Sequence, residues 1–222
     1  TVAVVASDPL LNRLTETLLT QIEAPTGGHD VRTLVQTIGT LSRTVGYRLG
    51  RHLDRVVPLF LRFCGDPRDE DHHTEAANEL RENCFQGFES FVLRCPREVA
   101  PHLSAVVQAS LNFLTFDPNY CYGSDDEGGA GGDEDMDGGS GEEEFSDDDF
   151  GGGSDDDDTS WKVRRSAVKT LGAVVRCRPE LLQELYAQCA GELIGRFKER
   201  EENVRVDLVR CFEALLDATI AA

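Results

Sequence analysis

The chain has 222 residues, of which 40% are apolar, and this is enough for one or two domains with a sizeable core. Its formal net charge of −19 is concentrated in one place, because residues 123–160 contain 17 Asp or Glu and no Lys or Arg, whereas the rest of the chain has 24 acidic and 22 basic residues. A nucleic-acid-binding domain has an excess of basic residues, which this chain lacks, so nucleic acid is not an expected partner. No apolar run is long enough to cross a bilayer, so a membrane is not an expected partner either.

Apolar residues recur with the period of an α-helix along most of the chain, and no segment shows the alternating pattern of a β-strand. The helices are expected at 8–23, 30–46, 49–64, 77–95, 97–115, 160–177, 179–197 and 203–219. The pattern therefore predicts an all-α fold with short turns.

The C-terminal part contains an internal repeat. Residues 163–175 align without gaps on residues 204–216, which lie 41 positions later, and residues 80–92 fall into the same register two repeats upstream. Residues 30–45 form a weaker copy. Helical pairs of about 40 residues are the unit of HEAT and armadillo arrays, in which neighbouring pairs stack to bury their apolar faces. The sequence predicts a HEAT-repeat α-α solenoid of about four helical pairs, and an ordinary helical bundle is the alternative.

The acidic residues lie between the two helices of one predicted pair. From 123 to 160 only four residues are apolar and eleven are Gly, so the segment cannot bury enough surface to offset its ordering entropy. It is expected to be a disordered insertion. The predicted organisation is HEAT repeats in 1–117, an acidic loop within one repeat in 118–159, and further HEAT repeats in 160–222.

Two acidic motifs resemble metal sites. Residues 133–144 satisfy the calcium-loop pattern D-x-D-x-D-G-x5-E, but the flanking helices of an EF-hand and its aliphatic eighth position are missing. Residues 69–73 (DEDHH) lack the ligand spacing of a zinc site. No metal site and no cofactor are expected.

Four serines in the acidic segment precede an acidic residue by three positions, which is the context of acid-directed kinases, although serines are also common in disordered segments. These candidate phosphorylation sites are Ser124, Ser140, Ser146 and Ser154.

The predicted helices carry no nucleophile elbow, phosphate loop or carboxylate pair, so no catalytic residue and no small-molecule substrate are predicted. The seven cysteines are odd in number and form no C-x-x-C pair, which is typical of free thiols in a reducing compartment. The protein is expected in the cytoplasm and nucleus.

Two groups of basic residues have different expected roles. Arg164 and Arg205 recur at one repeat position, where polar contacts between stacked repeats are expected. Other basic residues point away from the apolar stripe or lie in turns, and these are the candidate partner-binding residues: Lys162, Arg165, Lys169, Lys198, Arg200 and Arg210.

Several segments resemble one known family: FESFVLRCPREVAPH (88–102), LTFDPNYCY (114–122), the acidic run that leads into SWKVRR (160–165), and LIGRFKEREENVR (193–205). The chain is similar over about 37–216 to the cullin-associated, neddylation-dissociated proteins, also called TATA-binding-protein-interacting proteins.

The resemblance implies a long HEAT solenoid that wraps around a cullin bound to its RING subunit, of which this chain is an internal section. It implies a non-enzymatic scaffold that binds the unneddylated cullin and promotes exchange of substrate-receptor modules on cullin–RING ubiquitin ligases, including assembly of SCF complexes. The protein is expected to be a monomer when it is not bound to a cullin.

Two other functions fit the acidic segment. An importin-β-like nuclear transport receptor also carries an acidic loop within one HEAT repeat, and would use it to bind basic cargo. An acidic histone chaperone is the third hypothesis.

Overall fold

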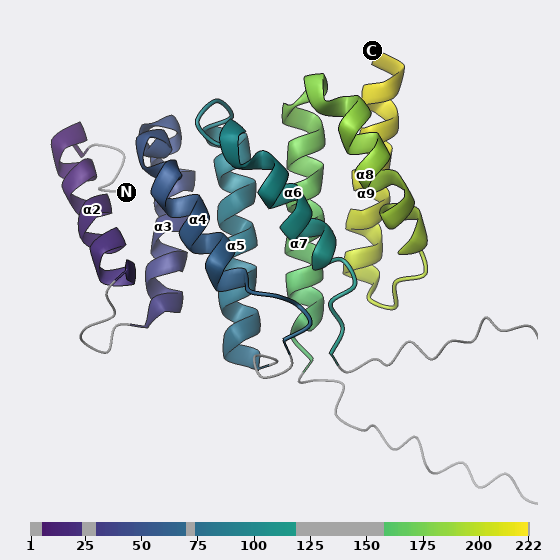
Figure 1. The fold of residues 1–222 in the computed structure, drawn as a ribbon, viewed down its shortest axis with the longest axis horizontal. Helices are drawn as coiled ribbons and strands as arrows, with labels where there is room; N and C mark the ends of the chain where they lie inside the picture. The colour runs from purple at the N-terminus through teal and green to yellow at the C-terminus, as the bar shows by residue number, and fades with distance from the viewer. Residues whose placement is uncertain (1–5, 24–29, 70–73, 119–157, 222) are drawn as a thin grey trace, which may run out of the picture.

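The computed structural model describes residues 6–23, 30–69, 74–118 and 158–221, and these form a row of helical pairs that runs from α2 at one end to α8 and α9 at the other (Figure 1). The first helices of the pairs are α2 (Asp8–Glu23), α4 (Leu53–Cys64), α6 (Leu103–Asn112) and α8 (Leu182–Gly195). The second helices are α3 (Val31–Val45), α5 (Glu75–Arg94), α7 (Ser160–Cys177) and α9 (Glu202–Ala221). No strand occurs among the described residues.

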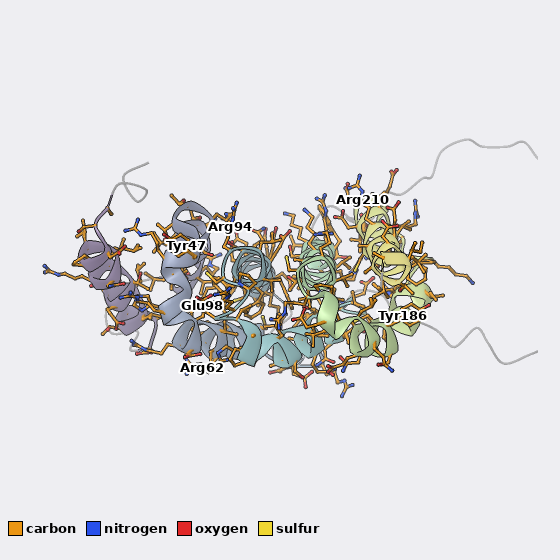
Figure 2. The ribbon with its side chains drawn as sticks, turned by 90° about the horizontal axis from the view of Figure 1, so that it is seen from above. Tyr47, Arg62, Arg94, Glu98, Tyr186 and Arg210 are labelled. Atoms are coloured by element: carbon orange, nitrogen blue, oxygen red, sulfur yellow. The ribbon has the colours of Figure 1, made fainter. Side chains whose placement is uncertain are left out.

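The helices form two layers. The second helices α3, α5, α7 and α9 pack side by side in chain order, and each also packs against the first helix of its own pair. Viewed from above, α4, α6 and α8 lie along the opposite side of the molecule from the second helices (Figure 2). The predicted HEAT-repeat α-α solenoid of four helical pairs is confirmed for the described part of the chain.

The core between the layers is rich in phenylalanine. Phe60 of α4 and Phe85, Phe88 and Phe91 of α5 are fully buried, and the rings of Phe60 and Phe91 lie 5.6 Å apart. The residue at position 87 must be small, because a Cβ there would lie 2.5 Å from the Phe60 ring. The spacing of glycine and phenylalanine along α5 therefore sets how closely the two helices of this pair approach.

Three of the expected first helices begin later than the apolar pattern indicates. Each is preceded by a 3₁₀ turn: η1 (Gly46–His52), η3 (Ala100–His102) and η5 (Pro179–Leu181). An apolar stripe does not distinguish a 3₁₀ turn from the first turn of an α-helix, since both place residues three apart on one side. Gly46 follows the last residue of α3 and begins η1, and its φ of 59° favours glycine.

The apolar stripe of α9 is buried only in part. Val204 and Leu208 are buried as expected, but Val209 and Leu216 are 49% and 41% exposed. The equivalent Val168 of α7 is 1% exposed, because α7 packs between α5 and α9. In the described chain α7 packs on one side of α9, and the outer part of the α9 stripe lies at the surface.

None of the helices in the described residues has the length and apolarity that a membrane crossing requires.

Candidate partner-binding surface

Helix α7 is the basic element of the second-helix layer. Its sequence, SWKVRRSAVKTLGAVVRC, contains five basic residues and no acidic one. Arg164 is fully buried, whereas Lys162 and Arg176 are exposed and Arg165 and Lys169 are partly buried. Lys162, Arg165 and Lys169 follow the spacing i, i+3, i+7, so they lie along one side of the helix.

These three side chains line a groove between α5 and α7, which we call the α5–α7 groove. It has a volume of about 480 Å³ and lies beside the second helices. Its lining residues are Arg43 of α3, Glu82, Gln86, Glu89, Ser90, Leu93 and Arg94 of α5, and Trp161, Lys162, Arg165, Ser166 and Lys169 of α7. Five of them are basic and two are acidic, so the groove has a positive balance although the whole chain is negative.

The basic side chains of the groove differ in how they are paired. Arg165 donates from Nε to Asp207 Oδ2 of α9 at 2.8 Å, and the Lys162 ammonium lies 5.9 Å from the Trp161 ring centroid. Within the described residues, Lys162, Lys169 and Arg94 have no carboxylate within 4.0 Å. These cations can therefore pair with an anionic group from another molecule without breaking an existing ion pair.

A buried polar cluster joins the last two pairs. Arg164, which is 0% exposed, donates from Nε and Nη2 to the two carboxylate oxygens of Glu199 at 3.2 and 3.1 Å. Its Nη1 donates to the Phe116 carbonyl at 2.8 Å and to Ser160 Oγ at 2.9 Å. A guanidinium that makes two parallel bonds to one carboxylate fixes the orientation of both groups.

Burial and the neighbouring arginines together shift the pKa values of the cluster's two carboxyl groups in opposite directions. Burial alone would raise the pKa of Glu199, but the Arg164 guanidinium, the Glu201 N–H and Arg196 together lower it. Burial raises the pKa of Asp117, and the charges of Arg164 and Arg200 offset this only in part. Glu199 is thus the carboxylate that the cluster stabilises in its charged form.

The repeated arginine has the same role in three pairs. Arg81 donates to the Cys64 carbonyl at 3.1 Å, Arg164 donates to the Phe116 carbonyl, and Arg205 donates to the Glu199 carbonyl at 3.0 Å. Each acceptor ends or follows the first helix of the same pair, where carbonyls lack an intrahelical partner. The expected contact between stacked pairs is seen for Arg164, which also binds Glu199 of the next pair, whereas the bond of Arg205 to the Glu199 carbonyl lies within its own pair.

Arg200 lies at the base of the acidic segment. Its Nη2 donates to Asp117 Oδ1 at 3.3 Å and to Asp158 Oδ2 at 2.7 Å. Asp117 stands shortly before residues 119–157 and Asp158 directly after them, and both carboxylates are at most 8% exposed. One guanidinium therefore holds together the two points at which the chain enters and leaves that segment.

The structure separates the six candidate partner-binding residues. It brings Lys162, Arg165 and Lys169 together in the α5–α7 groove. Arg210 lies on the same side of the molecule, on α9 (Figure 2), with Nη1 3.5 Å from Asp207 Oδ1. Lys198 is exposed in the turn between α8 and α9, near Arg200, which is engaged by the two aspartates. Neither Lys198 nor Arg200 lines the groove.

Several sequence predictions fall on residues outside the described part. These are the candidate phosphorylation sites Ser124, Ser140, Ser146 and Ser154, the calcium-loop pattern at 133–144, and most of the DEDHH motif at 69–73. Among the residues that the structure does describe, no group of three or more His, Cys, Asp or Glu side chains is placed to bind a metal ion.

The sequence interpretation missed most of the groove's other residues. Arg43, Leu93, Arg94 and Trp161 were not singled out, because each lies at a helical position that resembles an ordinary exposed or core residue. The 83-residue offset between α5 and α7 was an available signal, because it makes Glu82 and Gln86 of α5 equivalent to Arg165 and Lys169, and all four line the groove.

The comparisons with known proteins point to one family. No family model matches the chain. The mouse protein named Cullin-associated NEDD8-dissociated protein 2 is 47% identical over 196 residues, which is 88% of this chain and 15% of the relative. The Dictyostelium discoideum protein named Cullin-associated NEDD8-dissociated protein 1 is 47% identical over 218 residues, which is 97% of this chain and 17% of the relative. The Arabidopsis thaliana protein of the same name is 40% identical over 214 residues, or 96% of this chain and 16% of the relative.

The chain thus spans about one sixth of the length of these curated relatives. The alignments run through the helical pairs that form the groove and the buried arginine cluster, since they cover nearly all of the chain. The chain belongs to the family of cullin-associated NEDD8-dissociated proteins.

Proposed function

We propose that this chain is part of a non-enzymatic scaffold that binds a cullin–RING complex and regulates the assembly of cullin–RING ubiquitin ligases. The observation that carries the proposal is the 47% identity over 97% of the chain to a relative whose name states cullin association. The second-helix side of the solenoid is the proposed contact surface, with Lys162, Arg165 and Lys169 of the α5–α7 groove and Arg210 of α9 as contacts.

The partner is the cullin without its NEDD8 modification, and the scaffold promotes exchange of substrate-receptor modules when the whole protein acts. The word "NEDD8-dissociated" in the names of the relatives supports this preference. The protein is a monomer before it binds and acts in the cytoplasm and nucleus. We further propose that residues 118–159 are an acidic insertion within the third pair, between 1–117 and 160–222.

The importin-β-like alternative assigns the acidic segment to basic cargo. The basic balance of the α5–α7 groove would repel such cargo from the second-helix side, and the relatives are named for cullin association. Both observations favour the cullin–RING partner.

The test is equilibrium binding of the chain to a purified cullin–RING complex, with and without NEDD8 attached to the cullin. We expect binding to the unmodified complex and weaker binding to the modified one. Equal affinity for the two forms would refute the preference for unneddylated cullin, and no binding to either form would refute the proposed partner for this section of the solenoid.

A further inference from the structure

We infer that the α5–α7 groove binds an acidic peptide segment of a partner protein, one that also carries an apolar side chain. This inference deepens the proposed function, because it states the chemistry of the partner's surface at one defined place.

The charges of the groove indicate an anionic ligand. Arg43, Arg94, Lys162, Arg165 and Lys169 converge on it from three helices, against Glu82 and Glu89 alone. Glu82 already accepts a hydrogen bond from Gln86 at 2.9 Å, and Arg165 is paired with Asp207. The other four cations have no carboxylate partner among the described residues, and these are the ones that a ligand's carboxylates would meet.

The spacing of the lysines fits a peptide. Lys162 and Lys169 are seven residues apart on one side of α7, which separates their Cα atoms by about 10 Å along the helix axis. Carboxylates two turns apart on a partner helix, or three residues apart on an extended segment, match this separation. The ligand therefore needs at least two acidic residues with one of these spacings.

Apolar surface in the groove distinguishes a peptide from a nucleic acid. Leu93 is 45% exposed at the edge of the groove, and Trp161 is partly buried in its wall. A leucine or similar side chain of a peptide can cover Leu93, whereas a phosphate backbone cannot. Glu82 and Glu89 within the groove would also repel a polyanion of high charge density.

The groove lies on the second-helix side of the molecule, away from α4. Arg94 of α5 and Arg210 of α9 extend from one side of the two layers, and Arg62 of α4 extends from the opposite side (Figure 2). Arg62 is exposed, and its nearest assigned partner is the Phe63 ring at 5.2 Å. It supplies a single charge-reversal control outside the groove.

The first experiment uses a fluorescent probe peptide rich in glutamate with a leucine at every fourth position. Its binding to the chain is measured by fluorescence anisotropy. We expect saturable binding that weakens as salt is raised, and weakening by roughly tenfold or more in the double variant Lys162→Glu/Lys169→Glu. The Arg62→Glu variant should bind the peptide as tightly as the unmodified chain does. Circular dichroism checks that each variant remains folded.

Two further probes test the ligand class. A peptide with lysine in place of glutamate, and a single-stranded DNA of similar length, should both bind at least tenfold more weakly than the acidic peptide. DNA that binds as tightly as the peptide, or a double reversal that weakens peptide binding no more than Arg62→Glu does, would overturn the inference. Tighter peptide binding after deletion of residues 123–157 would support it, because the chain's own carboxylates would then be competitors for the same groove.

The second experiment repeats the charge reversals with the unneddylated cullin–RING complex. Loss of binding in the double variant and not in Arg62→Glu would place the partner's acidic segment in the groove. If the unmodified chain binds the probe peptide but not the complex, the proposed function fails and the inference about the groove stands. If the complex binds all variants equally while the peptide binds none, the inference fails and the proposed function stands.

Discussion

Removal of Arg164 should destabilise the solenoid more than any exposed substitution does. The side chain is 0% exposed and makes hydrogen bonds to both carboxylate oxygens of Glu199, to the Phe116 carbonyl and to Ser160 Oγ. In Arg164→Met the glutamate, 1% exposed, stays in the protein interior without its main counter-charge. Arg196 still contacts Glu199, so the remaining charge is compensated only in part.

The expected magnitude follows from the partners that remain. Breaking a buried ion pair by removing one member costs about 3–5 kcal/mol. A buried carbonyl left without its donor costs roughly 1–3 kcal/mol when it stays dry. Because the two effects share one side chain and are not additive, we expect a total loss of about 3–5 kcal/mol, which is a large part of the stability of an ordinary domain.

Urea denaturation followed by far-UV circular dichroism measures this loss. The matched control is Arg62→Met, which removes an exposed arginine and should change the free energy of unfolding by less than about 0.5 kcal/mol. The double variant Arg164→Met/Glu199→Leu removes both charges and should be more stable than Arg164→Met alone. A loss below about 1 kcal/mol in Arg164→Met would show that the cluster contributes no more than a surface ion pair, and would refute the reasoning.

The packing, the ionisation and the thiols of the chain give three further predictions. Gly87→Ala places a Cβ 2.5 Å from the Phe60 ring and should lower the free energy of unfolding in urea by about 1–3 kcal/mol. The control Gly191→Ala, with no atom within 4 Å of the new Cβ, should be neutral or stabilising. A tolerated Gly87→Ala would contradict the close approach of α4 and α5. The pKa of Glu199 is lowered in the folded state, so its contribution to the free energy of unfolding is complete above its ordinary pKa of 4.5 and is lost as the pH falls through the pKa of the folded state. Glu199→Gln should therefore reduce the loss of stability at acidic pH. An unchanged loss at acidic pH would argue against the ion pair with Arg164. Burial raises the pKa of the Cys211 thiol to about 12, whereas Cys177 is only partly buried. Alkylation of the folded chain, followed by mass spectrometry, should therefore label Cys177 well before Cys211. Equal labelling rates would mean that α9 opens readily.

The helical pairs could be predicted from the sequence because each second helix repeats its apolar stripe in register. The stripe Leu34, Ile38, Leu41 and Val45 is buried in α3 as the weak fourth copy predicted. Periodicity is a property of the chain itself, so it needs no knowledge of the neighbours. The periodicity did not predict burial correctly where burial depends on a neighbouring helix, as for Val209 and Leu216 on the outer part of the α9 stripe.

The candidate surface could be predicted only in part for the same reason. The basic residues of α7 are visible in the sequence, since no acidic residue interrupts them. Whether a cation is available in a groove or is already paired with a carboxylate depends on residues far away in the chain. Arg200 illustrates this: its partners Asp117 and Asp158 are 83 and 42 positions distant, and only the folded structure brings both of them to one guanidinium.

The ion pairs of Arg200 with Asp117 and Asp158 bring the two positions that flank residues 119–157 to one place in the array. Because Asp117 and Asp158 are bound by the same side chain, a change in the segment between them should have little effect on the packing of the helical pairs on either side. We therefore expect that a change in the length or charge of residues 119–157, or a fluorescent reporter inserted there, leaves the packing of the helical pairs unchanged.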